Sequence, residues 1–327
     1  MRTAQLAAVF MSLAAPAAAG VPVFNLPLEC EPGVDCFIQN YIDADPGAGA
    51  ADYTCGPLTY DGHKGVDLAI PDMAAMKRGV NVIAAAPGTV TKVRNFVPDR
   101  RSPSDPLSDM NGRECGNGVE ISHGGGWTSK YCHMKQYSIT MRQGEKVAKG
   151  TVMGQVGLSG RTQFPHVHMS VYKDGNLVDP FNPSGIVSCD PRPASDSLWQ
   201  DPPAYLPGGI VNMGTTSKLP KFEAARMGMV QASSFPADAP MLVLWVQAFG
   251  VRDGDRLEMK ILGPGGPVID DVVDLTREQA RAFRYLGKRQ TETTPSFWPS
   301  GDYVSSVRHM RGDSEIDYRE QRFTIGD

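Results

Sequence analysis

Short runs of β-branched and apolar residues, separated by glycine turns, dominate residues 62–172. Such runs lie at residues 80–84, 89–93, 119–122, 146–148 and 152–156. β-branched side chains favour an extended backbone, and regularly spaced turn residues let each strand reverse onto its neighbour. The sequence therefore predicts an all-β fold built from antiparallel sheets in this part of the chain.

A second group of predicted strands follows a proline-rich stretch. Residues 190–220 contain six prolines and Gly208-Gly209, which is typical of a stiff linker. Strands are then predicted at residues 241–249, 256–261, 303–309 and 318–325, with a short helix at residues 275–286. We expect residues 221–327 to form a smaller, immunoglobulin-like β-sandwich that acts as an accessory domain.

The first 19 residues have the pattern of a secretory signal peptide. Arg2 lies in a charged start, residues 4–15 are apolar, and Ala17-Ala18-Ala19 provides small residues for cleavage. The apolar run is shorter than the about 20 residues that cross a bilayer. We therefore expect cleavage after Ala19 and an exported protein without a membrane span.

An even set of six cysteines agrees with export, where disulfides persist. Cys115 and Cys132 flank a predicted hairpin with its turn at residues 123–126, so we expect them to be bonded. The sequence leaves the other pairings open. Of these we favour Cys36 with Cys55 and Cys30 with Cys189, which would tie residues 20–60 into a cross-linked N-terminal segment.

The charge balance argues against a nucleic-acid partner. The chain has 32 Lys and Arg residues against 36 Asp and Glu residues, a net charge of −4. Proteins that bind nucleic acids or anionic membranes carry an excess of basic residues instead.

Four potential metal ligands occur in two short motifs. His63 and Asp67 form an H-x-x-x-D pattern, and His166 and His168 form an H-x-H pattern. Side chains two residues apart on a strand share a face, so one histidine of the second pattern can bind a metal while its neighbour contacts substrate or water. Catalytic zinc takes three such protein ligands and leaves a fourth position open.

These motifs resemble those of the lysostaphin-type zinc endopeptidases, which cut the peptide part of bacterial peptidoglycan. The resemblance covers about residues 62–172 and includes Tyr131-Cys132-His133, the segments at residues 116–124 and 143–147, and Gly157-Leu158-Ser159-Gly160. It implies one zinc ion per chain, held by His63, Asp67 and His168. It also implies His133 and His166 as catalytic residues, and residues 61–189 as the peptidase domain. The chain departs from the family at Phe164, where a small residue is usual, so the shape of the groove is expected to differ.

From this resemblance we expect a periplasmic endopeptidase acting on peptidoglycan, with the D-alanyl–diaminopimelate bond as its target. Residues 20–190 should then perform the chemistry without the C-terminal domain, for which a protein partner is left open. Two alternatives are a non-catalytic relative that binds the wall or activates an amidase, and an adhesion module based on the C-terminal domain.

Overall fold

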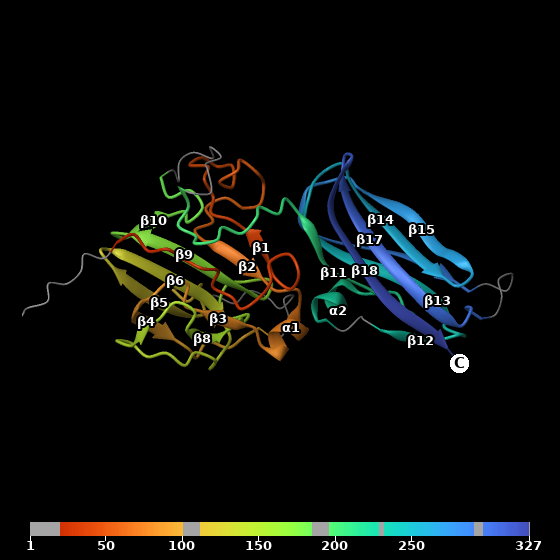
Figure 1. Cartoon of the computed structure of the whole chain (residues 1–327), viewed down its shortest axis with the longest axis horizontal. Coiled ribbons are helices and arrows are strands. Elements are labelled where there is room, and N and C mark those ends of the chain that lie inside the picture. The colour runs from red at the N-terminus through yellow and green to blue at the C-terminus, as the bar shows by residue number, and fades with distance from the viewer. Residues whose placement is uncertain (1–19, 101–111, 185–195, 229–231, 291–296, 327) are drawn as a thin grey trace, which may run out of the picture.

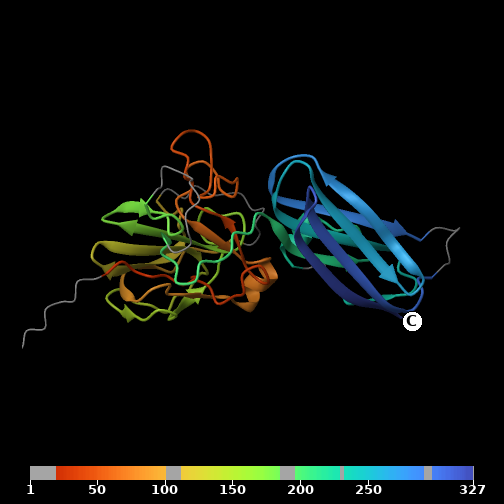
Figure 2. The same cartoon turned by 45° about the horizontal axis from the view of Figure 1, so that its top comes forward.

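The computed structural model describes residues 20–100, 112–184, 196–228, 232–290 and 297–326. The predicted signal peptide, residues 1–19, lies outside them. Two β-rich domains lie side by side (Figure 1), and the view in Figure 2 shows the same division. The predicted all-β class is confirmed, because the helices of the described part are short: α1 (Met73–Arg78) and α2 (Phe222–Arg226). None of the described helices has the length and apolar character needed to cross a membrane.

The N-terminal domain is built on an eight-stranded sheet with the order β1-β2-β9-β6-β5-β4-β7, in which β10 also pairs with β9. Its strands are β1 (Phe37–Asn40), β2 (Val66–Ala69), β4 (Gly88–Arg94), β5 (Asn117–Gly124), β6 (Trp127–Met134), β7 (Lys146–Val147), β9 (His166–Lys173) and β10 (Asn176–Val178). A separate two-stranded sheet pairs β3 (Asn81–Ile83) with β8 (Val152–Gln155). All the pairings of these strands are antiparallel, as predicted.

One row of residues crosses the sheet and sets the position of the site. Asn40 on β1 is the register partner of Asp67 on β2, and Asp67 is the partner of His168 on β9. His168 in turn faces Cys132 on β6. Residues in register on neighbouring strands have their β-carbons close together. Strand pairing thus joins residues that lie far apart in the sequence.

The N-terminal segment belongs to the same domain core. Phe24, Leu28 and Tyr41 are buried in one apolar cluster with Val66, Leu68 and other strand residues. Residues 38–40 also pair with β2. Residues 20–60 were expected to be a cross-linked segment outside the peptidase domain, but they supply an edge strand and part of its interior.

The C-terminal domain contains two sheets that share a core. The first has the order β11-β13-β16 and the second β12-β18-β17-β14-β15. The strands are β11 (Gly209–Thr216), β12 (Ser234–Pro236), β13 (Met241–Val251), β14 (Asp255–Gly263), β15 (Gly266–Leu275), β16 (Gln279–Arg289), β17 (Gly301–Arg311) and β18 (Ser314–Gly326). Leu244 and Val246 of one sheet and Met259 and Val307 of the other lie in one buried cluster, as in a β-sandwich. The immunoglobulin-like topology stays a prediction.

The predicted helix at residues 275–286 is wrong. Residues 279–289 form β16, which pairs with β13 from Met241↔Arg289 to Val251↔Gln279. Leu286 and Ala282 pack against the sandwich core. Tertiary pairing with a buried neighbouring strand overrides the local helical pattern.

In the expected linker at residues 190–220, the described part from residue 196 onward is largely packed structure. Leu198 and Trp199 are buried in the core of the N-terminal domain, and the hydroxyl of Tyr205 donates to Asp52 at 2.7 Å. Strand β11 of the second domain already begins at Gly209. Apolar side chains between the prolines anchor the stretch, so the change of domain falls between Tyr205 and Gly209.

One of the three predicted disulfide pairings is confirmed by the structure. Cys115 is bonded to Cys132, as expected. Cys36 is bonded to Cys30, so the favoured pairings Cys36–Cys55 and Cys30–Cys189 are both wrong. A tight turn explains this, because the amide of Gly33 donates to the carbonyl of Cys36 at 2.7 Å and the two cysteine α-carbons lie 6.0 Å apart. Cys55 is also disulfide-bonded, and Cys189 lies outside the described residues.

Candidate metal centre and active site

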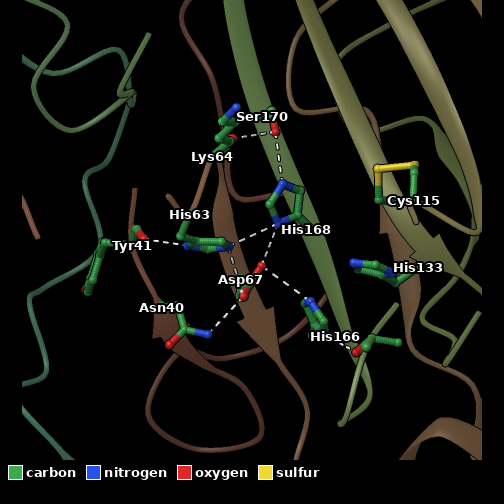
Figure 3. A network of polar contacts seen from close by, with 12 residues as sticks. Asn40, Tyr41, His63, Lys64, Asp67, Cys115, His133, His166, His168 and Ser170 are labelled. Atoms are coloured by element: carbon green, nitrogen blue, oxygen red, sulfur yellow. Dashed lines mark hydrogen bonds and ion pairs between the residues drawn. A yellow bond between two sulfur atoms is a disulfide. The ribbon is translucent and has the colours of Figure 1, made fainter. Parts of the chain in front are cut away.

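Asp67 lies at the centre of a histidine cluster on the large sheet (Figure 3). Its Oδ1 is 2.8 Å from Nδ1 of His168, and its Oδ2 is 3.2 Å from Nε2 of His63. The same two ring nitrogens lie 3.2 Å from each other. The structure therefore brings together the three ligands predicted from the sequence, although 105 residues separate the two histidines.

In both His63 and His168, the ring nitrogen that points away from Asp67 has a fixed hydrogen-bond partner. Nδ1 of His63 lies 2.6 Å from the carbonyl oxygen of Tyr41, which can only accept, so this nitrogen carries the proton. Nε2 of His168 lies 3.0 Å from Oγ of Ser170, whose own proton goes to the carbonyl of Lys64 at 2.7 Å. Ser170 must therefore accept from His168. In the neutral ring of each histidine, the nitrogen that faces Asp67 therefore carries no proton.

His133 and His166 are arranged in the same way. Nδ1 of His133 donates to the carbonyl of Ser159 at 2.9 Å, and Nδ1 of His166 donates to the carbonyl of Phe164 at 2.9 Å. Their Nε2 atoms are thereby left without a proton in the neutral ring. Nε2 of His166 lies 3.3 Å from Oδ1 of Asp67, so both histidines of the H-x-H pair reach the same oxygen and share one face of β9.

Burial and mutual contact set the charges of the cluster. Burial alone would raise the pKa of Asp67, but the neighbouring His166 and His63 hold that pKa well below its usual range. Burial lowers the pKa of His168, and its hydrogen bond to Asp67 only partly opposes this. Burial, together with His166, holds the pKa of His133 well below its ordinary value. Asp67 is therefore an anion, while His168 and His133 are neutral near pH 7.

Two backbone positions next to the site, Gly65 and His133, restrict which residues can occupy them. A β-carbon added at Gly65 would lie 2.3 Å from Nε2 of His168, so only glycine leaves room for this ring. His133 has a φ of 63°, which is uncommon for a residue other than glycine. The disulfide of its neighbour Cys132 and the 2.8 Å hydrogen bond from its amide to the carbonyl of Cys115 hold it there. Such strain is found where a side chain must be aimed at a functional site.

The cluster opens to solvent through a pocket of about 340 Å³. The lining residues are Asn40, Tyr60, Asp67, His133, Arg161, Thr162, Gln163, Phe164, His166 and His168. His63 lies behind it and is buried. The Phe164 ring stacks on His166 with 4.4 Å between the ring centroids, so this residue forms part of the pocket wall.

Sequence patterns did not reveal several residues of the site. Asn40 donates to Oδ2 of Asp67 at 2.9 Å, and the Tyr60 ring lies 4.5 Å from that of His63. Ser170 is the partner of His168 described above. An isolated Asn, Tyr or Ser carries no local signal. Only the pairing of β1 with β2 could have pointed to Asn40.

The remaining two histidines lie outside the site. The ring nitrogens of His123 form hydrogen bonds with the carbonyl of Pro87 and the hydroxyl of Ser129, and His309 is buried in the second domain.

The arrangement fits a metal cation. His63, Asp67 and His168 offer ligand atoms that all lie within 4.8 Å of one another. Two nitrogen lone pairs and a buried carboxylate would repel one another without a positive charge between them. His133, His166 and His168 also lie within this distance, but that set omits the carboxylate. The mixed nitrogen and oxygen set suits a transition-metal ion of borderline softness.

Comparison with known proteins agrees with the site. Residues 61–180 match the profile of peptidase family M23. "Peptidoglycan DD-endopeptidase ShyA" of Vibrio cholerae is 29% identical over 117 residues, which are 36% of this chain and 22% of that protein. "Stage II sporulation protein Q" of Bacillus subtilis is 31% identical over 126 residues, 38% of this chain and 37% of that protein. The chain thus spans less than two fifths of the length of either relative.

Among solved structures, the catalytic domain of the prophage-encoded M23 protein EnpA from Enterococcus faecalis is 26% identical. The match covers 50% of this chain and 98% of that one, with a TM-score of 0.31. The family match covers all five site positions from His63 to His168. The predicted resemblance is confirmed, because residues 61–180 match the model of peptidase family M23.

Proposed function

We propose that this protein is a zinc-dependent endopeptidase that hydrolyses peptide bonds in the stems or cross-links of peptidoglycan. One observation carries the proposal: the three predicted ligands lie together, and two of them line a solvent-open pocket with two further histidines. The family match of residues 61–180 and the likeness to a peptidoglycan endopeptidase support it.

His63, Asp67 and His168 would hold one zinc ion per chain. When bound, zinc supplies Lewis acidity, which acidifies water and polarises a carbonyl oxygen. Ser170 and the carbonyl of Tyr41 keep the ligand rings in the required tautomer. Such outer partners are important for metal affinity.

His133 and His166 are placed to move protons. Each has its Nδ1 hydrogen committed to a carbonyl oxygen, which leaves Nε2 unprotonated in the neutral ring, so Nε2 can accept the proton of the attacking water and donate a hydrogen bond afterwards. Hydrolysis breaks the C–N bond of the peptide, adds hydroxyl to the carbonyl carbon and leaves a proton for the departing amine.

We further propose the D-alanyl–diaminopimelate cross-link as the bond that is cut and the periplasm as the compartment. The name of the Vibrio relative and the signal-like residues 1–19 support this. Two disulfides among the described residues, Cys30–Cys36 and Cys115–Cys132, agree with an oxidising compartment. A non-catalytic role is disfavoured, because all five histidine and aspartate positions are present.

The test is digestion of purified cross-linked muropeptides followed by mass spectrometry. The proposal expects monomers with a free D-alanine carboxylate and a free diaminopimelate amine, and no cleavage after zinc removal with 1,10-phenanthroline. Restored cleavage on adding zinc would confirm the dependence. Binding of intact muropeptides without any product would support the non-catalytic alternative instead.

A further inference from the structure

A second hollow lies where the two domains meet. It has a volume of about 650 Å³, with Gln39, Asn40, Tyr60, Gln163 and Phe164 of the N-terminal domain on one side. The other side is formed by Phe222, Arg226, Arg277, Glu278, Gln279, Ala280 and Arg281. These residues come from α2, from the turn between β15 and β16, and from the start of β16, on the side of the second domain that faces the first (Figures 1 and 2).

This interdomain cleft is continuous with the pocket of the metal centre. Asn40, Tyr60, Gln163 and Phe164 line both. Phe164 makes the connection most directly, since its ring stacks on His166 and also lies 4.9 Å from the guanidinium carbon of Arg281. A peptide that extends from the metal centre along this side would therefore enter the cleft.

Direct contacts hold the second wall in place. Gln39 donates to the carbonyl of Ala280 at 2.9 Å and accepts from Nε of Arg281 at 2.9 Å. Phe37 stacks on Phe249, with 4.5 Å between the ring centroids. Arg226 donates to the carbonyl of Gln163 at 2.5 Å. The wall is thus fixed to the N-terminal domain by apolar and polar contacts.

The cleft is cationic, although the whole chain has a net charge of −4. Its charged lining residues are three arginines and one glutamate, and Arg226 also pairs with Glu223 at 3.7 Å. Arg281 lies between the rings of Phe37 and Phe164 and forms no ion pair with any carboxylate in the described part of the chain. Its Nη2 is buried and has no hydrogen-bond partner there. Burial and the nearby Arg226 lower the pKa of Arg281 to about 9, and the negative charge of Asp72 only partly opposes this.

We propose that this cleft is a subsite for a carboxylate-bearing part of the substrate peptide, with Arg281 and Arg277 as the residues that recognise the negative charge. Arginine suits the role, because its planar guanidinium can bind a carboxylate through two hydrogen bonds. The C-terminal domain then forms a wall of the substrate groove. This replaces the expectation that residues 20–190 act alone, and it rests on the proposed function.

The test compares two substrates that differ only in charge. One is a cross-linked muropeptide dimer with free carboxylates, and the other is the same dimer with those carboxylates amidated. Arg277→Ala and Arg281→Gln are expected to raise KM for the free acid about tenfold, with a smaller change in kcat, and to leave the amidated dimer unaffected. Arg322→Ala, at an exposed arginine on β18, is the matched control and should change neither.

Binding separates failure of this inference from failure of the proposed function. Calorimetry with the full-length His133→Ala protein should show tighter binding of the free acid than of the amidated dimer. Adding Arg277→Ala should abolish the difference. Arg277 is exposed, so its loss does not disturb packing. Equal effects of the arginine variants on both dimers, or no effect on either, would overturn the inference. Cleavage of neither dimer by the wild type would contradict only the proposed function.

Discussion

Asp67 and His168 lie opposite each other in register on β2 and β9, with 2.8 Å between Oδ1 and Nδ1. A carboxylate oxygen and an unprotonated imidazole nitrogen at this distance repel each other unless a cation lies between them. A hydrogen bond to another side chain positions each of them: Asn40 donates to Asp67, and Ser170 accepts from His168. These two hydrogen bonds fix the orientation of the pair.

Ser170→Ala should weaken zinc binding about 10- to 100-fold, the usual effect of losing an outer partner of a histidine ligand. Without the hydroxyl, Nε2 of His168 loses its acceptor and the ring can change its tautomer. Competition with a chromophoric chelator measures the affinity. Unchanged affinity would show that Ser170 does not orient the ligand.

Gly65→Ala should reduce both metal content and stability. The added methyl group would lie 2.3 Å from Nε2 of His168, so the ring must leave its position. Gly326→Ala is the control, because a β-carbon there meets nothing within 4 Å. Metal analysis and thermal unfolding of both variants test this, and full zinc occupancy in Gly65→Ala would contradict it.

His133→Ala and His166→Ala should each retain zinc but lose at least ~100-fold in kcat, the scale of a positioned proton-transfer group. Turnover of the muropeptide dimer and metal content are measured on the same samples. A variant with wild-type turnover would remove that histidine from the catalytic residues.

The C-terminal domain should lose stability in acid through a buried cluster. Asp255 accepts hydrogen bonds from His309 at 2.8 Å and from Arg311 at 2.8 and 2.9 Å. Burial opposes ionisation of Asp255, but Arg311 and the amide of Arg252 hold its pKa below the usual value. Its stabilisation is present above the unfolded pKa of about 3.9 and is lost as the pH falls through the lower folded value. Burial lowers the pKa of His309, so a further loss begins near pH 6.5, its approximate unfolded value.

Asp255→Asn tests this cluster and should cost about 3 kcal/mol near neutral pH, because it leaves Arg311 without its carboxylate partner. Asp270→Asn, which removes an exposed ion pair with Lys260, is the control and should cost under about 1 kcal/mol. Urea unfolding at several pH values measures both. The account fails if Asp255→Asn keeps the wild-type dependence on pH below about 4.

The sequence motifs contain the five residues that the structure brings together, whereas the domain arrangement depends on distant contacts. His63, Asp67, His133, His166 and His168 lie in short motifs, and their chemistry requires those residue types at those spacings. Gly65 and Asn40 act through contacts between strands, which local patterns do not contain. Residues 279–289 and Leu198 were misassigned because their structure depends on partners far away in the chain. The Cys30–Cys36 bond depends on a tight turn that composition alone did not reveal.

Zinc titration of the metal-free protein tests the central claim most directly. Wild-type protein should bind one zinc ion per chain and gain muropeptide cleavage in proportion to occupancy. His168→Ala should bind none at the same concentrations, while His123→Gln, outside the cluster, should behave as wild type. Stoichiometric zinc binding by His168→Ala, or full cleavage by wild-type protein without zinc, would contradict the account.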